Sequence, residues 1–266
     1  MRKYLTIFKI SFQQEFAYRL NFVLWRVRNV LQIFIAFFLW NTIFSDPGRV
    51  VFGYDRAKIL TYIFGLIIIR AIVLSSRAID IAGEVSRGDL TNQLLRPMGY
   101  IKYWFTRDLS SKALNLIFSV FEASILFLIF KPQFFFQTNF LLFFLFLTSL
   151  VIAVILFFFL MFIANMLPLW LPDQPWGMSF LLFIFTDFLG GGVFPLDILP
   201  SYITKIIYLT PFPYLLFMPL QIYLGKLDLI TSFNSILIGT VWVIVLALGT
   251  KVVWSQGLKS YGAVGR

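Results

Sequence analysis

Long apolar runs, broken by short polar or proline-containing stretches, are the feature that most constrains this chain. Sixty per cent of its 266 residues are hydrophobic and only 13% are charged, and the mean hydropathy is +0.88. A soluble domain has roughly 25% charged residues. So few charges cannot cover a globular surface, and the sequence therefore predicts that most of the chain is dissolved in a lipid bilayer.

The absence of two residue types excludes several kinds of active site. The chain has no histidine and no cysteine, which removes serine–histidine and cysteine–histidine hydrolases, imidazole or thiolate metal sites and disulfides. The net charge of +10 is interpreted as basic loops on the cytoplasmic side of a membrane and not as a nucleic-acid interface. An enzyme of this composition would have to use carboxylates, lysine, serine or threonine. Our interpretation assigns no catalytic residue, no metal site and no nucleic-acid partner.

The apolar runs predict an all-α integral membrane protein with six transmembrane helices. Each run is compared with the roughly 20 apolar residues needed for one crossing. Turn signals at Asp46-Pro47-Gly48 and Lys131-Pro132 separate neighbouring runs. The fifth run is interrupted by three consecutive glycines, residues 190–192. The predicted spans are residues 22–44, 57–79, 109–130, 140–167, 177–194 and 231–254.

Two further segments are expected to lie at the membrane surfaces. Residues 2–20 have an imperfect helical apolar stripe, which favours an interfacial helix, although a tilted extension of the first span also fits. Residues 195–222 are apolar but contain five prolines, and non-helical backbone at membrane depth needs protein or water around it. They predict two short re-entrant helices on the outer side, within a single permease domain of residues 1–266.

The distribution of basic residues predicts the orientation. With the N-terminus inside, fifteen of the 22 basic residues lie on inner segments, Arg70 lies within a span, and six lie on outer segments. An excess of lysine and arginine marks cytoplasmic loops. We expect a multi-pass protein of the plasma (inner) membrane with both termini in the cytoplasm. The six outer residues are Arg49, Arg56, Lys58, Lys131, Lys205 and Lys226.

The longest polar stretch contains a predicted amphipathic helix between the second and third spans. Ser86 is positioned as its N-cap, with Asp89 three residues later. Leu90, Leu94 and Leu95 would form its apolar side, and Pro97 would end it. On these residues alone, a surface loop helix without a partner explains the pattern equally well.

Two motifs in this order resemble a known family, the type 2 ABC exporter permeases. Glu84, Arg87-Gly88-Asp89-Leu90 and Leu94-Leu95-Arg96-Pro97 resemble the cytoplasmic loop of that family, in a branch whose loop ends in arginine and proline. Phe194-Pro195-Leu196, Pro211-Phe212-Pro213 and Leu224-Gly225 are similar to its outer segment before the last span. Together with the six runs, the resemblance covers nearly the whole chain.

The resemblance implies a transmembrane subunit without its own ATPase. Such permeases pair with a second half, identical or paralogous, and bind two ABC ATPase subunits through the cytoplasmic loop. This chain contains no Gly-x-x-x-x-Gly-Lys-[Ser/Thr] loop, so ATP and magnesium are expected on the partner and no cofactor on this chain. The substrate would be a lipid, glycan, peptide or drug-like molecule. The implied coupling residues are Glu84, Arg87, Gly88, Asp89, Leu90, Leu94, Leu95, Arg96 and Pro97.

Three charged residues within the predicted spans are candidates for the translocation path. Charges in lipid are costly and usually face the bundle interior or a cavity. By helical rise, Arg70 and Asp187 lie at similar depths, whereas Glu122 matches Arg70 less well. The family resemblance places spans two and five along the path. An intramembrane ion pair between Arg70 and Asp187 is favoured over a direct substrate contact.

Two other functional classes remain open. A six-span substrate-binding subunit of an uptake system, or a small secondary transporter, would need broken helices repeated in two halves, but the interrupted segment occurs once. A lipid-modifying membrane enzyme would need clustered acids. The closest acidic residues, Asp80, Glu84 and Asp89, are better explained by solvated pairs with nearby arginines.

Overall fold

Helices make up most of the part of the chain that the structure describes. The computed structural model describes residues 2–15, 19–46, 48, 50–171 and 176–261. Within them, extended backbone pairs only at an isolated bridge between Val51 and Tyr54. The prediction of an all-α membrane protein is confirmed.

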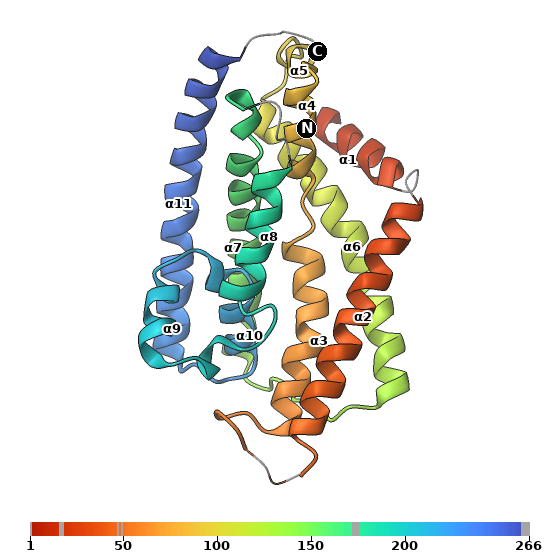
Figure 1. The fold of residues 1–266 in the computed structure, drawn as a ribbon, viewed down its shortest axis with the longest axis vertical. Helices are drawn as coiled ribbons and strands as arrows, with labels where there is room; N and C mark the ends of the chain where they lie inside the picture. The colour runs from red at the N-terminus through yellow and green to blue at the C-terminus, as the bar shows by residue number, and fades with distance from the viewer. Residues whose placement is uncertain (1, 16–18, 47, 49, 172–175, 262–266) are drawn as a thin grey trace.

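The long helices run side by side along the long axis of the molecule (Figure 1). One end carries α4 and α5, here called the α4/α5 end, and the opposite end carries the loop before α3. The helices are α1 Arg2–Glu15, α2 Arg19–Ile43, α3 Arg56–Val73, α4 Asp80–Ser86, α5 Leu90–Leu94, α6 Tyr100–Phe130, α7 Phe140–Ala164, α8 Gly177–Leu189, α9 Ser201–Tyr208, α10 Phe217–Tyr223 and α11 Leu229–Ser260.

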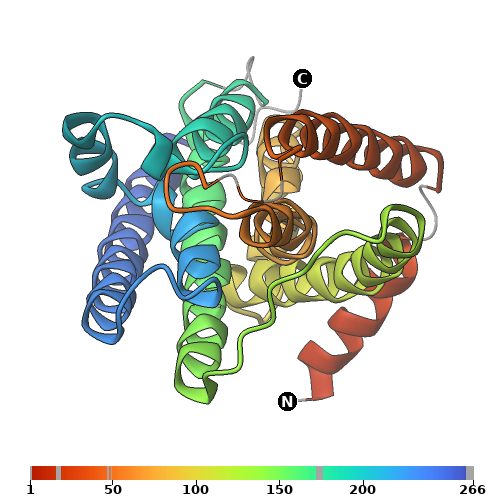
Figure 2. The same ribbon diagram turned by 90° about the horizontal axis from the view of Figure 1, so that it is seen from below.

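Helix α3 occupies the middle of the bundle (Figure 2). It packs against α2, α6, α7 and α10. Asp55 caps its first turn by accepting a hydrogen bond from the backbone N–H of Lys58. Most of its residues up to Ile69 are buried on all sides, which explains why this apolar run shows no amphipathic stripe.

The structure does not establish six crossings. Among the described residues, α6, α7 with the turn after it, and α11 are long and apolar enough to span a membrane. A fourth candidate combines α3 with residues 77–86, a pair bent by 50°. The fifth predicted span is only the 13-residue α8, about 20 Å long. Six spans remain a prediction.

The predicted single helix after Ser86 is wrong. Ser86 is the last residue of α4, and the five-residue α5 begins at Leu90 without a side-chain cap. Gly88 lies between them with φ of +78°, a conformation that glycine adopts without steric cost. Asp89 pairs with Arg87 instead of closing a capping box. Residues 84–97 therefore form a helix end, a turn and a second short helix.

The proline-rich segment before the last long helix forms the two short helices expected there, α9 and α10, with 3₁₀ turns before each. Helix α10 is buried over residues 217–222 and packs against α7, α11 and α3. This segment lies in the half of the molecule away from α4 and α5, beside the lower part of α11, while α2 and α3 extend beyond it (Figure 1).

Candidate functional site

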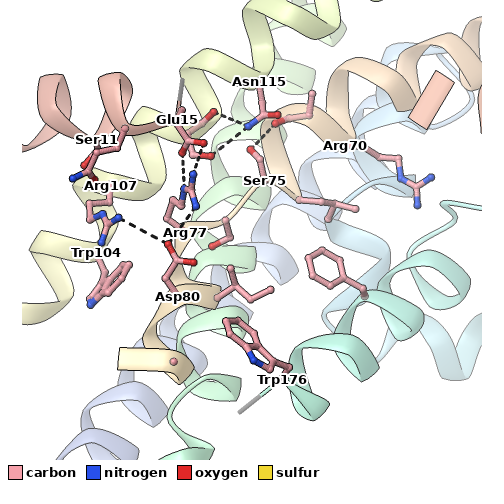
Figure 3. A pocket seen from close by; sticks show the side chains of 18 of the residues that line it. Ser11, Glu15, Arg70, Ser75, Arg77, Asp80, Trp104, Arg107, Asn115 and Trp176 are labelled. Carbon is pink, nitrogen blue, oxygen red and sulfur yellow. Dashed lines mark hydrogen bonds and ion pairs between the residues drawn. The ribbon is translucent and has the colours of Figure 1, made fainter. Parts of the chain in front are cut away.

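A large cavity lies at the α4/α5 end of the bundle. Its volume is about 940 Å³, and its lining extends from Gly83 and Arg87 to Arg70 and Asp187. Side chains from α1, α2, α3, α4, α6 and α8 contribute to it (Figure 3). Its charged lining residues are Arg26, Arg28, Arg70, Arg77, Arg87, Arg107, Glu15, Asp80, Glu84 and Asp187.

The wall of this cavity near α4 is a network of ion pairs centred on Arg77. The Arg77 guanidinium pairs with Glu15 of α1 and, at 3.3 Å, with Asp80. Arg107 of α6 lies 3.9 Å from the same Asp80 carboxylate and 4.6 Å above the ring of Trp104. Figure 3 shows these side chains converging from different helices. The network ties α1 and α6 to the segment after α3.

A second set of contacts joins α2 to α6. Arg26 donates to the Glu122 carboxylate at 3.1 Å and to the Asn115 side-chain oxygen at 2.7 Å. The Arg26 side chain is 11% exposed and that of Glu122 is 14% exposed. Glu122, predicted as a poor match for Arg70, therefore has a different arginine partner.

Arg70 and Asp187 form an ion pair between α3 and α8. Gly192, which follows α8, lies against this pair: a Cβ atom there would approach the Asp187 carboxylate to 2.9 Å and the Arg70 guanidinium to 3.2 Å. Of the three glycines that interrupt the fifth apolar run, Gly192 is thus the one that leaves room for the pair.

A second, mostly apolar cavity begins where the first one ends. Its volume is about 260 Å³. Arg26, Gln32, Arg70 and Asp187 line both cavities, so the Arg70–Asp187 pair lies at their junction. Beyond it the lining is almost entirely apolar, with Ile35, Ala36, Leu39, Ile63 and Val193 among its residues. Ile35 is 69% exposed, so this cavity reaches the side of the bundle.

The coupling segment predicted at residues 84–97 has an inward and an outward side. Glu84 is buried and accepts a hydrogen bond from the Tyr100 hydroxyl at 2.8 Å, and Leu90 is fully buried. Neither is available to a partner. Arg87, Asp89, Arg96 and Pro97 are exposed, and Leu94 and Leu95 are 44% and 81% exposed.

Two other parts of the chain fasten this segment. Lys3 of α1 donates to the Pro97 carbonyl at 3.0 Å. Tyr261, directly after α11, donates to the Gly88 carbonyl at 2.9 Å. Together with Tyr100 of α6, these contacts hold the segment to three long or terminal helices.

The most deeply buried charged pair among the described residues was not predicted from the sequence. Asp108 and Lys112 lie one turn apart on α6 and form an ion pair of 3.2 Å, with side-chain exposures of 0% and 5%. Lys112 is one of the fifteen basic residues assigned above to the inner segments, although it lies inside the predicted third span. The sequence does contain a signal for a buried ion pair here: Lys112 lies within an apolar run, and Asp108, of opposite charge, lies four residues earlier.

Comparison with known proteins gives one family. The family model described as "ABC-2 family transporter protein" matches residues 30–265. Comparison with curated proteins gives no match.

Proposed function

The chain belongs to the ABC-2 transporter family and is therefore a membrane subunit of an ABC transporter. From this premise we propose that it forms one half of an ATP-driven export path for an amphiphilic substrate. The resemblance of its motifs to type 2 ABC permeases agrees with this family. Two partner ATPases and a second permease half complete the proposed transporter.

The observation that carries this proposal is the pair of joined cavities. Together they extend from the α4/α5 end along α2 to Trp40, near the far end of that helix, and along α3 to Ile63, near its middle. The Arg70–Asp187 pair lies where they meet. A charged pair at such a depth is tolerated where it faces a cavity or the bundle interior. We assign this route as the translocation path.

The difference between the two cavities supports an amphiphile as substrate. Guanidinium, carboxylate, hydroxyl and amide groups surround the larger one, and they can hydrogen-bond a polar head. The smaller one offers apolar side chains and is bordered by exposed residues of α2. An apolar chain would lie there, with its head beyond the Arg70–Asp187 pair.

The exposed residues of the coupling segment are the proposed docking surface for the ATPase. Leu94 and Leu95 present apolar surface next to the charges of Arg87, Asp89 and Arg96. An apolar centre with a charged rim is typical of protein interfaces. The excess of basic residues at this end supports its placement in the cytoplasm.

A transport assay tests the path. The permease and its co-purifying ATPase are reconstituted in liposomes, and ATP-dependent movement of a short-chain fluorescent phospholipid is measured. Ala36→Trp fills the apolar cavity and should lower the rate about tenfold, which corresponds to roughly 1.4 kcal/mol. Ala247→Trp, on a part of α11 that lines neither cavity, is the matched control and should transport at the normal rate. Equal rates for both variants would contradict the proposed path.

A further inference from the structure

Helix α3 breaks between the proposed path and the coupling segment. It ends at Val73, and after Leu74, Ser75 and Ser76 the chain continues as a 3₁₀ turn and α4 in a direction that differs by 50°. A helix end leaves backbone carbonyls and N–H groups without helical partners. Buried groups of this kind need other partners.

Helix α6 supplies those partners from two side chains. The Lys112 ammonium donates to the carbonyls of Val73, at 2.9 Å, and Ser75, at 2.5 Å. The Asp108 carboxylate accepts from the Ser76 hydroxyl at 2.5 Å and from the Arg77 backbone N–H at 2.9 Å. The pair thus binds both sides of the break.

The break lies one helical turn from the Arg70–Asp187 pair. The backbone N–H of Leu74 donates to the carbonyl of Arg70 at 2.9 Å, so Arg70 belongs to the last turn of α3. On the other side of the break, Arg77 leads directly into α4 and is paired with Glu15 and Asp80. Along the chain, Leu74, Ser75 and Ser76 are the direct connection between Arg70 and the α4–α5 segment.

We propose that Asp108 and Lys112 are positioning residues that clamp the break in α3 and thereby transmit movement of the α4–α5 segment to Arg70. The inference rests on the proposed function, since it assumes that the ATPase moves this segment. Without the clamp, residues 74–76 would bend and absorb the movement. With it, the last turn of α3, the break and α6 shift together, because the bonds are buried and charge-assisted.

The first measurement compares transport with ATP hydrolysis in the reconstituted transporter, with the short-chain fluorescent phospholipid as probe. Asp108→Asn and Lys112→Met should lower the lipid moved per ATP about tenfold, within the usual range of coupling between sites, while ATP hydrolysis continues. Ser119→Ala removes a buried α6 hydroxyl whose hydrogen bond stays within the helix, and it should leave the ratio unchanged. Unchanged ratios in all three variants would overturn the proposal.

A chemical bridge separates transmission from loss of stability. The chain has no cysteine, so Ser76→Cys combined with Asp108→Cys creates a unique thiol pair across the clamp. This double variant should be uncoupled, and a short bifunctional thiosulfonate should restore lipid movement until a reductant cleaves the bridge. Restored coupling supports the clamp, because a merely misfolded protein would not recover. If a bridge forms without restoring coupling, the clamp is overturned.

A thiol-labelling rate, which needs no transported substrate, distinguishes the proposed clamp from the proposed function in lipid transport. Ile67 lines the apolar cavity on α3, and the thiol of Ile67→Cys should react at a rate that changes with ATP. Lys112→Met should abolish this change. If ATP alters the labelling but no lipid moves, the clamp stands and the proposed substrate is wrong. If the ATP response is absent in the single variant Ile67→Cys, or persists when Lys112→Met is added to it, the clamp is overturned.

Discussion

The two ends of α3 are held by buried polar groups of different construction. At its C-terminal end, one helix provides both charges, Asp108 and Lys112, and they bind mainly backbone groups. Before its N-terminal end, Tyr54 belongs to a cluster of side chains drawn from separate segments. These are Asp197 in the turn after α8, Gln221 of α10 and Lys226 in the loop before α11.

We call Tyr54, Asp197, Gln221 and Lys226 the outer cluster, because they lie away from the break, at the other end of α3. Their contacts with one another are mostly between side chains. The Tyr54 hydroxyl donates to Asp197 at 3.0 Å and accepts from the Gln221 amide at 2.5 Å. Lys226 pairs with Asp197, and its ammonium lies 3.3 Å from the centre of the Tyr54 ring. Burial lowers the pKa of Lys226, and the neighbouring Asp197 carboxylate partly offsets this. Burial also raises the pKa of Tyr54, and the Asp197 charge adds to that shift.

If the proposed clamp operates, this difference predicts that the C-terminal end of α3 moves as a unit with α6 and that the contacts at the other end separate more readily. Bonds from a single helix, α6, reach the last residue of α3 and the residues directly after it, and so fix these elements together. The outer cluster joins Tyr54 to three other segments through side chains, and Asp197 and Lys226 retain 26% and 14% exposure. Water can replace partly exposed contacts at lower cost than fully buried ones.

The largest expected effect is on binding of the ATPase, and it distinguishes the α4/α5 end of the molecule from the opposite end. Leu95→Glu adds a charge to the proposed docking surface and should abolish co-purification of the ATPase, since a charge buried in an interface without a partner is costly. Val50→Glu adds the same charge at the opposite end, where Val50 is 65% exposed, and should leave the complex intact. Loss of the ATPase with Val50→Glu alone would reverse the proposed orientation.

A smaller effect is expected on the free energy of unfolding, and it compares Lys112 with Lys226. Lys112→Met leaves the Asp108 carboxylate buried without its cation and should destabilise the protein by about 3–5 kcal/mol. Lys226→Met removes a partly exposed partner of Asp197 and should cost about 1–3 kcal/mol. Unfolding of the detergent-solubilised variants measures both values. A larger loss for Lys226→Met would show that the outer cluster is the firmer attachment.

The smallest effect is a pH dependence confined to the outer cluster. Because the pKa of Lys226 is lower in the folded protein than its ordinary 10.5, the unfolded chain binds more protons between those two values. Stability contributed by this group therefore rises with pH through that interval and is lost as pH falls through the folded pKa. The difference in melting temperature between the parent protein and Lys226→Met should increase from pH 7 towards pH 10. A decreasing difference would contradict the assignment.

Much of the architecture followed from local sequence features. Apolar runs predicted the positions of α2, α3, α6, α7, α8 and α11, and the prolines of residues 195–222 predicted short helices there. The polar segment between α3 and α6 was also located from the sequence. It was predicted to form one helix, however, whereas it forms α4, a turn and α5. Gly88 adopts a positive φ, and the buried partners of Glu84 and Leu90 belong to distant segments that no local pattern reveals.

Composition and periodicity alone determined that this chain is helical and belongs in a membrane, because hydrocarbon demands apolar side chains and internally bonded backbone. Only the tertiary structure decided which charges meet. Arg70 reaches Asp187, Arg26 reaches Glu122, and Lys112 reaches the end of α3. A buried charge must find a partner somewhere, but helix packing, not distance along the sequence, decides where that partner lies.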